Sequence, residues 1–434
     1  EPSRWGSSAS IVNQPSMAGS CCLVGIPGAY RPPCVESDEA SGFAPVDLTF
    51  SPQHEAFRAE ARAWLEANVP TGLASMNTAE GYRQHLEWER TLFDARWAVV
   101  SWPEEYGGRE ADLMEWLIFE EEYYRCGAPG RVTQNGIFLL APTLFEHGTQ
   151  DQRDRYLRDM ASGAKTWAQG WSEPNAGSDL ASLTSRARQD GDHWVLNGQK
   201  TWSTRAVFCD YLFGLFRTDP EAQRHRGLTY FLVPLDAEGV TVRPIGGLHD
   251  DEAFAEVFFE DVRVHERDVL GGVNQGWAVA MATASSERGL SLRSPGRFMA
   301  TADRLLDLYR RCVSGEVGDG PLDLDPRLVD DVVQCWMDAD AYRLYTFQAV
   351  TRLMEGGTMG PEASLNKIFW SELDVRLHET AMALLGQLAE LDIDADEAVD
   401  HGRWMDGFLF SLAGPIYAGT NEIQRNVVAE RVLG

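Results

Sequence analysis

The fold class of this chain is decided by the stretch His193-Trp194-Val195-Leu196-Asn197-Gly198-Gln199-Lys200-Thr201-Trp202. The segments His193–Leu196 and Gln199–Trp202 flank Asn197-Gly198 and predict a β-hairpin, since Asn-Gly is a strong signal for a two-residue turn. Three further β runs follow, separated by Gly, Asp or Pro: Leu228–Leu235, Val240–Ile245 and Ala255–Val264. We therefore predict a small β domain over residues 166–272, folded as a sandwich or a barrel.

Helical patterns flank this β region on both sides. Upstream, Ser51-Pro52 predicts a helix start with a capping hydroxyl and a proline in the first turn. Apolar spacing then predicts helices over Tyr82–Trp97, Leu113–Tyr124 and Gln150–Met160. Downstream of Gly276, four segments are long enough for helices: Trp277–Arg310, Arg327–Glu355, Pro361–Gln387 and Ala395–Leu412. The predicted class is α+β multi-domain, with an N-terminal helical domain (47–165), the β domain (166–272) and a C-terminal four-helix bundle (273–434).

Composition narrows the possible partners. The 434 residues carry a formal net charge of −28, which argues against nucleic acid and anionic membranes. The sequence contains no run of about 18 apolar residues, so it predicts no membrane-spanning helix. The seven cysteines form no CxxC pair, so we expect a reduced cytoplasm, with neither a disulfide framework nor a metal site. Residues 1–46 are rich in Ser, Pro, Gly and Cys without a regular period, and we interpret them as a flexible extension.

Three motifs carry a resemblance to a known family. They are Gln169-Gly170-Trp171-Ser172-Glu173-Pro174-Asn175-Ala176-Gly177-Ser178-Asp179, the segment Asn197–Thr204, and Gly414-Pro415-Ile416-Tyr417-Ala418-Gly419-Thr420-Asn421-Glu422-Ile423-Gln424-Arg425. Together they resemble the flavin-dependent acyl-CoA dehydrogenases, whose domains follow the same helical, β, helical order. The resemblance covers residues 47–434. Taken alone, Asn197–Thr204 would also fit a structural hairpin with a core tryptophan.

The resemblance implies FAD as the cofactor. Trp171 and Ser172 would lie beside the pyrimidine edge of the flavin, and Ser178 would lie on its pyrophosphate side. Trp202 would pack on the ring, and Thr204 would bond near N5, the atom that accepts hydride. The full set of implied cofactor-binding residues is Gln169, Trp171, Ser172, Gly177, Ser178, Trp202, Thr204, Thr420 and Glu422.

The catalytic base is the main departure from the family pattern. Most members carry a catalytic glutamate where this chain has Ala418. A minority place that glutamate on the first helix of the C-terminal domain, at the position of Glu287, with a small residue in the tail. This chain shows the same exchange, so the resemblance implies Glu287 as the base. The alternative for Glu287 is an exposed surface carboxylate.

The implied reaction is oxidation of an acyl thioester to its α,β-enoyl form. Glu287 would remove the α proton while hydride leaves the β carbon for flavin N5. The backbone N–H of Ala418 would help to stabilise the developing enolate, a contribution of roughly 2.7–4 kcal/mol per donor. Arg288 and Gly419 are the implied substrate contacts, and a surface charge is the alternative for Arg288. Such an enzyme of lipid metabolism would use an acyl-CoA and pass electrons to an electron-transfer flavoprotein or a similar acceptor.

Two family segments that build the cross-subunit half of the cofactor site are missing. Arg310–Gly315 replaces one of them, and the other is reduced to Leu384–Gln387. Two other hypotheses therefore stand beside an active homodimeric or homotetrameric enzyme. One is a degenerate structural subunit of a hetero-oligomer. The other is a dehydrogenase or oxidase that acts on an acyl-carrier-protein thioester.

Overall fold

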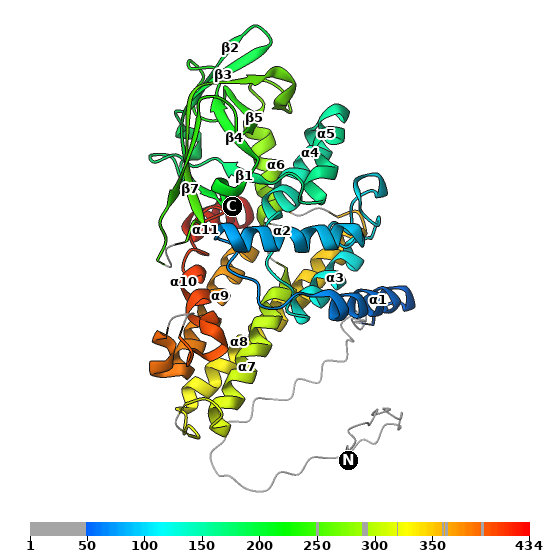
Figure 1. The fold of residues 1–434 in the computed structure, drawn as a ribbon, viewed down its shortest axis with the longest axis vertical. Coiled ribbons are helices and arrows are strands. Elements are labelled where there is room, and N and C mark those ends of the chain that lie inside the picture. Colours follow the sequence, from blue (N-terminus) through cyan, green and yellow to red (C-terminus); the bar gives the residue numbers. More distant parts are fainter. Residues whose placement is uncertain are drawn as a thin grey trace. The chain divides into compact units, whose positions relative to one another are not determined.

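The structure, a computed structural model, describes residues 49–248, 251–288, 294–318, 320–357, 360, 363–391 and 395–434; of residues 285–288 it describes the backbone alone. Residues 1–46, the predicted flexible extension, lie outside this part. Phe50–Gly434 forms one compact unit. Its elements follow the helical, β, helical order, which confirms the predicted fold class (Figure 1). None of the helices in the described ranges is both long and apolar enough to cross a membrane.

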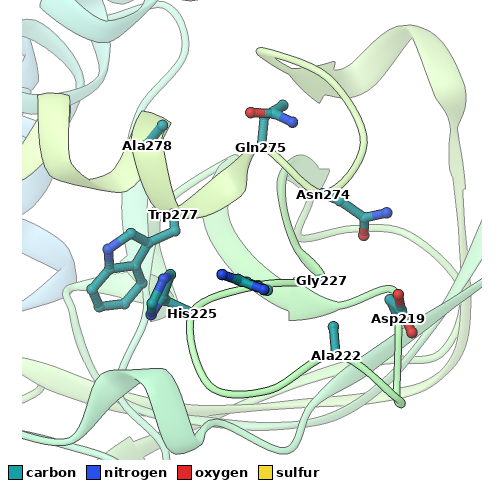
Figure 2. Close-up of a pocket in the computed structure, with 9 residues that line it drawn as sticks. Asp219, Ala222, His225, Gly227, Asn274, Gln275, Trp277 and Ala278 are labelled. Atoms are coloured by element: carbon teal, nitrogen blue, oxygen red, sulfur yellow. The ribbon is translucent and has the colours of Figure 1, made fainter.

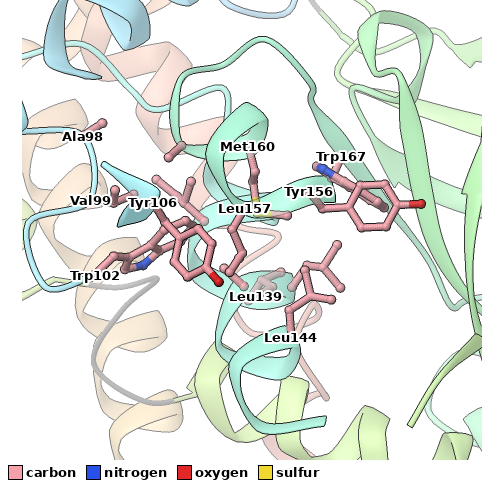
Figure 3. Packing of buried hydrophobic residues seen from close by; sticks show 14 of the residues in the cluster. Ala98, Val99, Trp102, Tyr106, Leu139, Leu144, Tyr156, Leu157, Met160 and Trp167 are labelled. Carbon is pink, nitrogen blue, oxygen red and sulfur yellow. The ribbon is translucent and has the colours of Figure 1, made fainter. Parts of the chain in front are cut away.

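Five α-helices build the N-terminal region. They are α1 (Pro52–Asn68), α2 (Ala79–Asp94), α3 (Leu113–Arg125), α4 (Ala141–His147) and α5 (Gln150–Ala161). The predicted start of α1 is confirmed, since Ser51 accepts a hydrogen bond from the His54 backbone N–H at 3.2 Å. Large aromatic and aliphatic side chains from these helices and their loops pack into one core, part of which Figure 3 shows.

The middle of the chain forms a single eight-stranded sheet. Its strands are β1 (Trp167–Gly170), β2 (Arg186–Asp190), β3 (His193–Thr204), β4 (Tyr211–Arg217), β5 (Leu228–Pro234), β6 (Val240–Ile245), β7 (Phe254–His265) and β8 (Val269–Leu270). Their order is β6-β7-β3-β2-β4-β5-β8, and β1 pairs with β4. Alternate residues of β5 face two cores: Tyr230 and Leu232 join the N-terminal core, whereas Phe231 and Val233 pack within the β region.

The predicted hairpin at Asn197-Gly198 is wrong. β3 runs unbroken from His193 to Thr204, and its register against β7 shifts between Leu196 and Gly198. Gly198 has a φ of +147°, and a Cβ there would lie 2.2 Å from the Ser185 hydroxyl oxygen. A β-bulge needs glycine for the same backbone reason as a tight turn. The true reversal lies between β2 and β3, where Asp190 pairs with His193 around Gly191-Asp192.

Six α-helices follow the sheet in the described ranges. They are α6 (Gly276–Arg288), α7 (Pro295–Ser314), α8 (Pro326–Met354), α9 (Ala363–Leu385), α10 (Arg403–Ser411) and α11 (Asn421–Val428). The predicted helix Trp277–Arg310 is two helices, because Ser294 caps α7 and Pro295 occupies its first turn. The predicted helix Ala395–Leu412 is shortened to α10, since Asp400 and His401 have left-handed backbones.

α6 connects the sheet to the helices around it. It packs against β5 on one side and against α4 and α9 elsewhere (Figure 1). Gly276 starts it, and a Cβ at that position would lie 2.7 Å from the Thr229 backbone, so the helix begins in close contact with β5. Elements that are far apart in sequence therefore meet at α6.

Candidate functional site

The first part of the candidate site is the chain that leaves β1. Gln169 is half-buried within the strand, and Trp171 and Ser172 follow its last residue. The indole N–H of Trp171 is buried and has no hydrogen-bond partner among the described residues. The Ser172 carbonyl accepts a hydrogen bond from the Thr201 backbone N–H at 2.9 Å. This bond ties the start of the loop to β3, so two of the three sequence motifs lie together.

A tight turn follows in the same loop. Glu173 and Ala176 exchange two backbone hydrogen bonds of 3.0 Å each. Gly177 and Ser178 are exposed beyond this turn, and no atom lies within 4 Å of the place where a Gly177 Cβ would stand. A ligand can therefore approach the backbone here.

A buried ion pair lies beneath the loop. The Lys200 ammonium nitrogen donates to Glu173 Oε1 at 2.8 Å, and the two side chains are 0% and 4% exposed. Burial would raise the pKa of Glu173, but the Lys200 charge and the surrounding donors outweigh it and lower this pKa to about 2. Burial lowers the pKa of Lys200 to about 8, although Glu173 acts in the opposite direction. Both groups are charged at neutral pH.

The end of β3 presents an aromatic ring. Trp202 is 60% exposed, and its backbone has a left-handed φ of +59°. Its ring meets Phe254 edge-on at a centroid distance of 5.9 Å. Thr204 is half-buried two residues later, and the buried Ser203 hydroxyl between them has no partner among the described residues. An exposed tryptophan next to a polar strand end can offer a flat apolar surface to a ring-shaped ligand.

The C-terminal tail forms a second turn, which we define as Pro415–Asn421. Its ends are joined by a hydrogen bond from the Asn421 backbone N–H to the Pro415 carbonyl at 2.9 Å. Ala418 and Gly419 both have left-handed backbones, with φ of +58° and +79°. Thr420 caps α11 through a bond from the Ile423 N–H.

Glu422 is exposed in the first turn of α11. Its pKa lies below its usual value because it accepts hydrogen bonds from its own backbone N–H and from Thr420. A carboxylate at a helix N-terminus is also favoured by the helix dipole.

Buried polar side chains anchor this tail turn. Gln424 is fully buried, and its amide nitrogen donates to the Ala418 and Gly419 carbonyls at 3.1 and 3.2 Å. Lys367 of α9, also fully buried, donates to Asn421 Oδ1 at 2.8 Å. These hydrogen bonds from buried side chains therefore fix the conformation of the turn.

The loop that follows β1, residues 171–179, is called the β1 loop below. A chain of contacts links it to α6. The Trp171 ring meets the Tyr230 ring edge-on at 6.4 Å. The Tyr230 hydroxyl lies 3.2 Å from the Thr283 hydroxyl on α6, and Thr283 also bonds Thr143 at 2.8 Å. Position 287 follows Thr283 by four residues on the same helix, which is about one turn. Glu287 and Arg288 have helical backbones, and their side chains lie outside the described part.

A cavity of about 440 Å³ opens beside the start of α6 (Figure 2). His225 and Trp277 line it, with ring centroids 5.9 Å apart. Arg226 and Asp219 contribute one charge of each sign. None of the residues predicted from the sequence lines this cavity.

The residues that hold the site in place are not predicted from the sequence. Lys200, Glu173 and Gln424 lie inside the quoted motifs but received no role. No local pattern marks the burial of Lys200, because its neighbours on β3, Gln199 and Thr201, are polar, and a lysine is rarely buried unless it is paired. The same holds for Lys367, because its burial depends on the tail turn covering α9.

The chain was compared with known proteins. Three models of one family match it: the acyl-CoA dehydrogenase N-terminal domain at residues 51–164, the middle domain at 168–262 and the C-terminal domain at 274–433. Acyl-CoA dehydrogenase IpdE1 of Mycobacterium tuberculosis is 38% identical over 392 residues, which cover 88% of this chain and 97% of that protein.

Solved structures give the same result. A structure titled Tcur3481-Tcur3483 steroid ACAD has a TM-score of 0.78 at 28% identity, covering 90% of this chain and 99% of that one. The ChsE4-ChsE5 complex from Mycobacterium tuberculosis has a TM-score of 0.75 at 28% identity, with the same coverage.

Proposed function

Because this chain belongs to the acyl-CoA dehydrogenase family, we propose that it catalyses the FAD-dependent α,β-dehydrogenation of an acyl thioester. The observation that carries this proposal is the contact chain from Trp171 through Tyr230 to Thr283. It connects the loop that would hold the cofactor to the helix that carries position 287. An acid–base residue one turn further along α6 would then lie close to the cofactor.

The residues present fit a flavin. The unpaired Trp171 indole N–H and Ser203 hydroxyl are hydrogen-bond donors near the place where a hydrogen-bonding ring system would lie. The open backbone at Gly177 suits a phosphate-bearing cofactor. We propose that Gln169, Trp171, Ser172, Gly177, Ser178, Trp202, Thr204, Thr420 and Glu422 hold FAD. When bound, FAD supplies the hydride acceptor for the substrate β carbon.

Glu287 is the proposed base for the α proton. Thr283, one turn earlier, is fully buried among hydroxyl and aromatic groups. A carboxylate one turn further along this helix would serve as a general base for the α proton. The proposed substrate contacts are Arg288 and Gly419.

In this proposal, Ala418 stabilises the negative charge that develops during the reaction. Its backbone N–H would face the thioester oxygen, which gains negative charge as the α proton leaves. The left-handed φ of Ala418 and its Gln424 anchor support this role, because strained backbone that is held from below is typical of functional sites. An alanine retains the N–H that a glutamate would have offered.

Glu287→Gln tests the base. The variant should bind FAD as the wild type does, yet it should reduce bound FAD at least about 10³-fold more slowly when a thioester is added without oxygen. The measurement is anaerobic bleaching of the flavin absorbance. Reduction at the wild-type rate would show that another group takes the proton.

The exchange variant Glu287→Ala with Ala418→Glu is the matched control. Its two positions would serve the same proton. If the exchange variant bleaches the flavin again, the two positions serve one proton. If the exchange variant stays as inactive as Glu287→Ala alone, that relation is wrong.

A second candidate is a subunit of a hetero-oligomer. Two observations favour it: the similarity to the ChsE4-ChsE5 complex, and the replacement of the cross-subunit segments by Arg310–Gly315 and Leu384–Gln387. In this chain, Arg311 is bonded instead to Asp400 at 2.8 Å. Molecular mass in solution, together with FAD bound per chain, separates a self-sufficient homo-oligomer from a subunit that needs a partner.

The acyl group remains to be assigned by experiment. The similarity to a steroid ACAD makes a bulky ring-bearing acyl group our first choice in a panel of thioesters of varied length and branching. CoA and acyl-carrier-protein forms of the same acid would identify the carrier, and an electron-transfer flavoprotein or oxygen would identify the acceptor.

We also propose the domain bounds 47–165, 166–272 and 273–434. The unpaired state of Cys126, Cys209, Cys312 and Cys335 favours the reducing cytoplasm as the place of action.

A further inference from the structure

The Glu173 carboxylate is fully used as an acceptor. Besides Lys200, it accepts from the Thr184 backbone N–H at 2.6 Å, the Thr184 hydroxyl at 2.8 Å and the Ser185 backbone N–H at 2.9 Å. These donors belong to the segment that leads into β2. The position of Glu173 is therefore set by groups on two sides.

Lys200 reaches further than its ion pair. Its ammonium also lies 3.4 Å from the Trp171 carbonyl oxygen, and it sits 5.0 Å from the centre of the Phe216 ring. The next residue on β3, Thr201, bonds the Ser172 carbonyl. Two consecutive residues of β3 thus hold three consecutive residues of the loop, 171 to 173.

The same two residues directly precede Trp202. The register of β3 against β7 shifts between Lys200 and Ser203, and Trp202 lies within this irregular stretch with its left-handed backbone. A residue in this conformation persists only where its neighbours fix the backbone around it. The buried side chain of Lys200 provides such a fixed point two residues before Trp202.

We propose that the Glu173–Lys200 pair is a positioning device that holds the Trp171–Ser172 segment and Trp202 at the spacing required to bind the flavin ring. The inference rests on the proposed function and assigns a role to two residues that do not touch the substrate. It predicts that loss of the pair changes cofactor binding beyond any effect on folding.

Physical reasoning separates this role from simple stabilisation. A buried ion pair is weak evidence for stability, because desolvation offsets much of the attraction: replacing both partners with apolar residues is often neutral, whereas removing one partner leaves a buried charge and is destabilising. The N-terminal region contains a matched pair: Arg131 Nε and Glu89 Oε2 are 2.7 Å apart, and the two side chains are 5% and 1% exposed. That pair lies in the N-terminal region, and its other hydrogen bonds reach Ala98 and Thr133, neither of which is a proposed cofactor residue.

The experiment is a titration of FAD-free protein with FAD, recorded by visible absorbance and paired with thermal unfolding of each FAD-free variant. Lys200→Met and Glu173→Gln should weaken FAD binding roughly 10- to 100-fold, the size of loss that removing a supporting partner causes at metal sites. The absorbance bands of the flavin that still binds should also shift. Arg131→Met should lower the melting temperature by a similar amount and leave FAD affinity within about twofold of the wild type.

Three results would overturn the inference. One is a folded Lys200→Met variant with wild-type FAD affinity and spectrum. Another is an equal loss of FAD affinity in Arg131→Met. If the wild-type chain itself binds no FAD, the proposed function fails and the inference with it, a result distinct from the failure of the pair alone.

A measurement on the unmodified chain covers the case in which the variants do not fold. FAD should slow hydrogen exchange at the Thr184 and Ser185 amides, which donate to Glu173. Slowing that is confined to residues 171–179 would contradict the inference.

Discussion

Buried side chains hold both the β1 loop and the tail turn Pro415–Asn421 in place, but the two sets of side chains differ in chemistry. The β1 loop is tied to β3 just before Trp202, with φ +59°, and the tail turn contains Ala418, with φ +58°, so each involves a non-glycine residue in the left-handed region. Beneath the β1 loop lies an ion pair, Glu173–Lys200. Beneath the tail turn, the Gln424 amide donates to two carbonyls, and the Lys367 ammonium donates to the Asn421 side chain of the turn itself.

The difference shows what each anchor responds to. An ion pair depends on the charge state of both partners, so the β1 loop has an anchor that titrates. The Gln424 amide has no charge to lose, and its bonds depend on geometry alone. Charge changes should therefore damage the two anchors in different ways, and the predictions below test this contrast.

The largest effect on stability is expected from Gln424→Glu. The new carboxylate would be fully buried and would face the Ala418 and Gly419 carbonyls, which are acceptors like itself. Leaving a buried charge uncompensated costs about 4 kcal/mol of unfolding free energy at neutral pH. Urea unfolding measures this loss.

The pH dependence of this variant gives its control. Burial raises the folded-state pKa of the new carboxyl, so the loss should shrink as the pH falls below that pKa and the group becomes neutral. Gln424→Leu removes the same two bonds without adding a charge and should cost about 2 kcal/mol at every pH. Equal costs for the two variants would show that the site is not buried enough to penalise charge.

The second largest effect is an acid-sensitive contribution of Glu173 to the free energy of unfolding. Its folded-state pKa of about 2 lies below the ordinary value of 4.5, so its stabilisation is present above pH 4.5 and is lost as the pH falls towards 2. The shift corresponds to about 3 kcal/mol. The stability difference between the wild type and Glu173→Gln should narrow by this amount between pH 5 and pH 2, as measured by urea unfolding. A constant difference over this range would mean that the ion pair does not cause the loss of stability at low pH.

The smallest effect on stability is expected from Trp202→Gly. Glycine relieves the left-handed strain but adds backbone entropy to the unfolded chain, so the unfolding free energy should change by less than about 1 kcal/mol. FAD affinity should nevertheless fall, because the exposed ring is lost. Ala418→Gly is the matched variant, with the same relief and no ring to lose. A large loss of stability in Trp202→Gly would mean that this ring packs within the protein rather than against a ligand.

Motifs and periodicity were enough to predict the helical, β, helical order and the family. The bounds of β6 and most of β5 and β7 also follow from local pattern, since each is a short apolar run between turn residues. The Asn197-Gly198 hairpin failed because a tight turn and a β-bulge make the same local demand for glycine. Only the long pairing of β3 with β7, in which Asp261 and Asn197 exchange two hydrogen bonds, decides between them.

The split between α6 and α7 was within reach of sequence reasoning. Ser294-Pro295 carries the same start signal as Ser51-Pro52, and it interrupts the long apolar period that predicts a single helix. The short α10 was not predictable in this way. Asp400 takes a left-handed backbone where its carboxylate bonds both Arg311 and Trp404, partners that no local pattern identifies together.

By itself, the sequence determined the fold class and the family of this protein, and it predicts a flavin site at the three motifs and a catalytic base at Glu287 instead of Ala418. These are local properties, because they depend on which residue types stand at which spacing. Only the tertiary structure decided that Lys200 lies beneath Glu173, that Gln424 holds the tail turn, and that Trp171 reaches α6 through Tyr230. The physical reason is that burial and hydrogen-bond partners depend on residues far apart in the chain, which the fold alone brings within bonding distance.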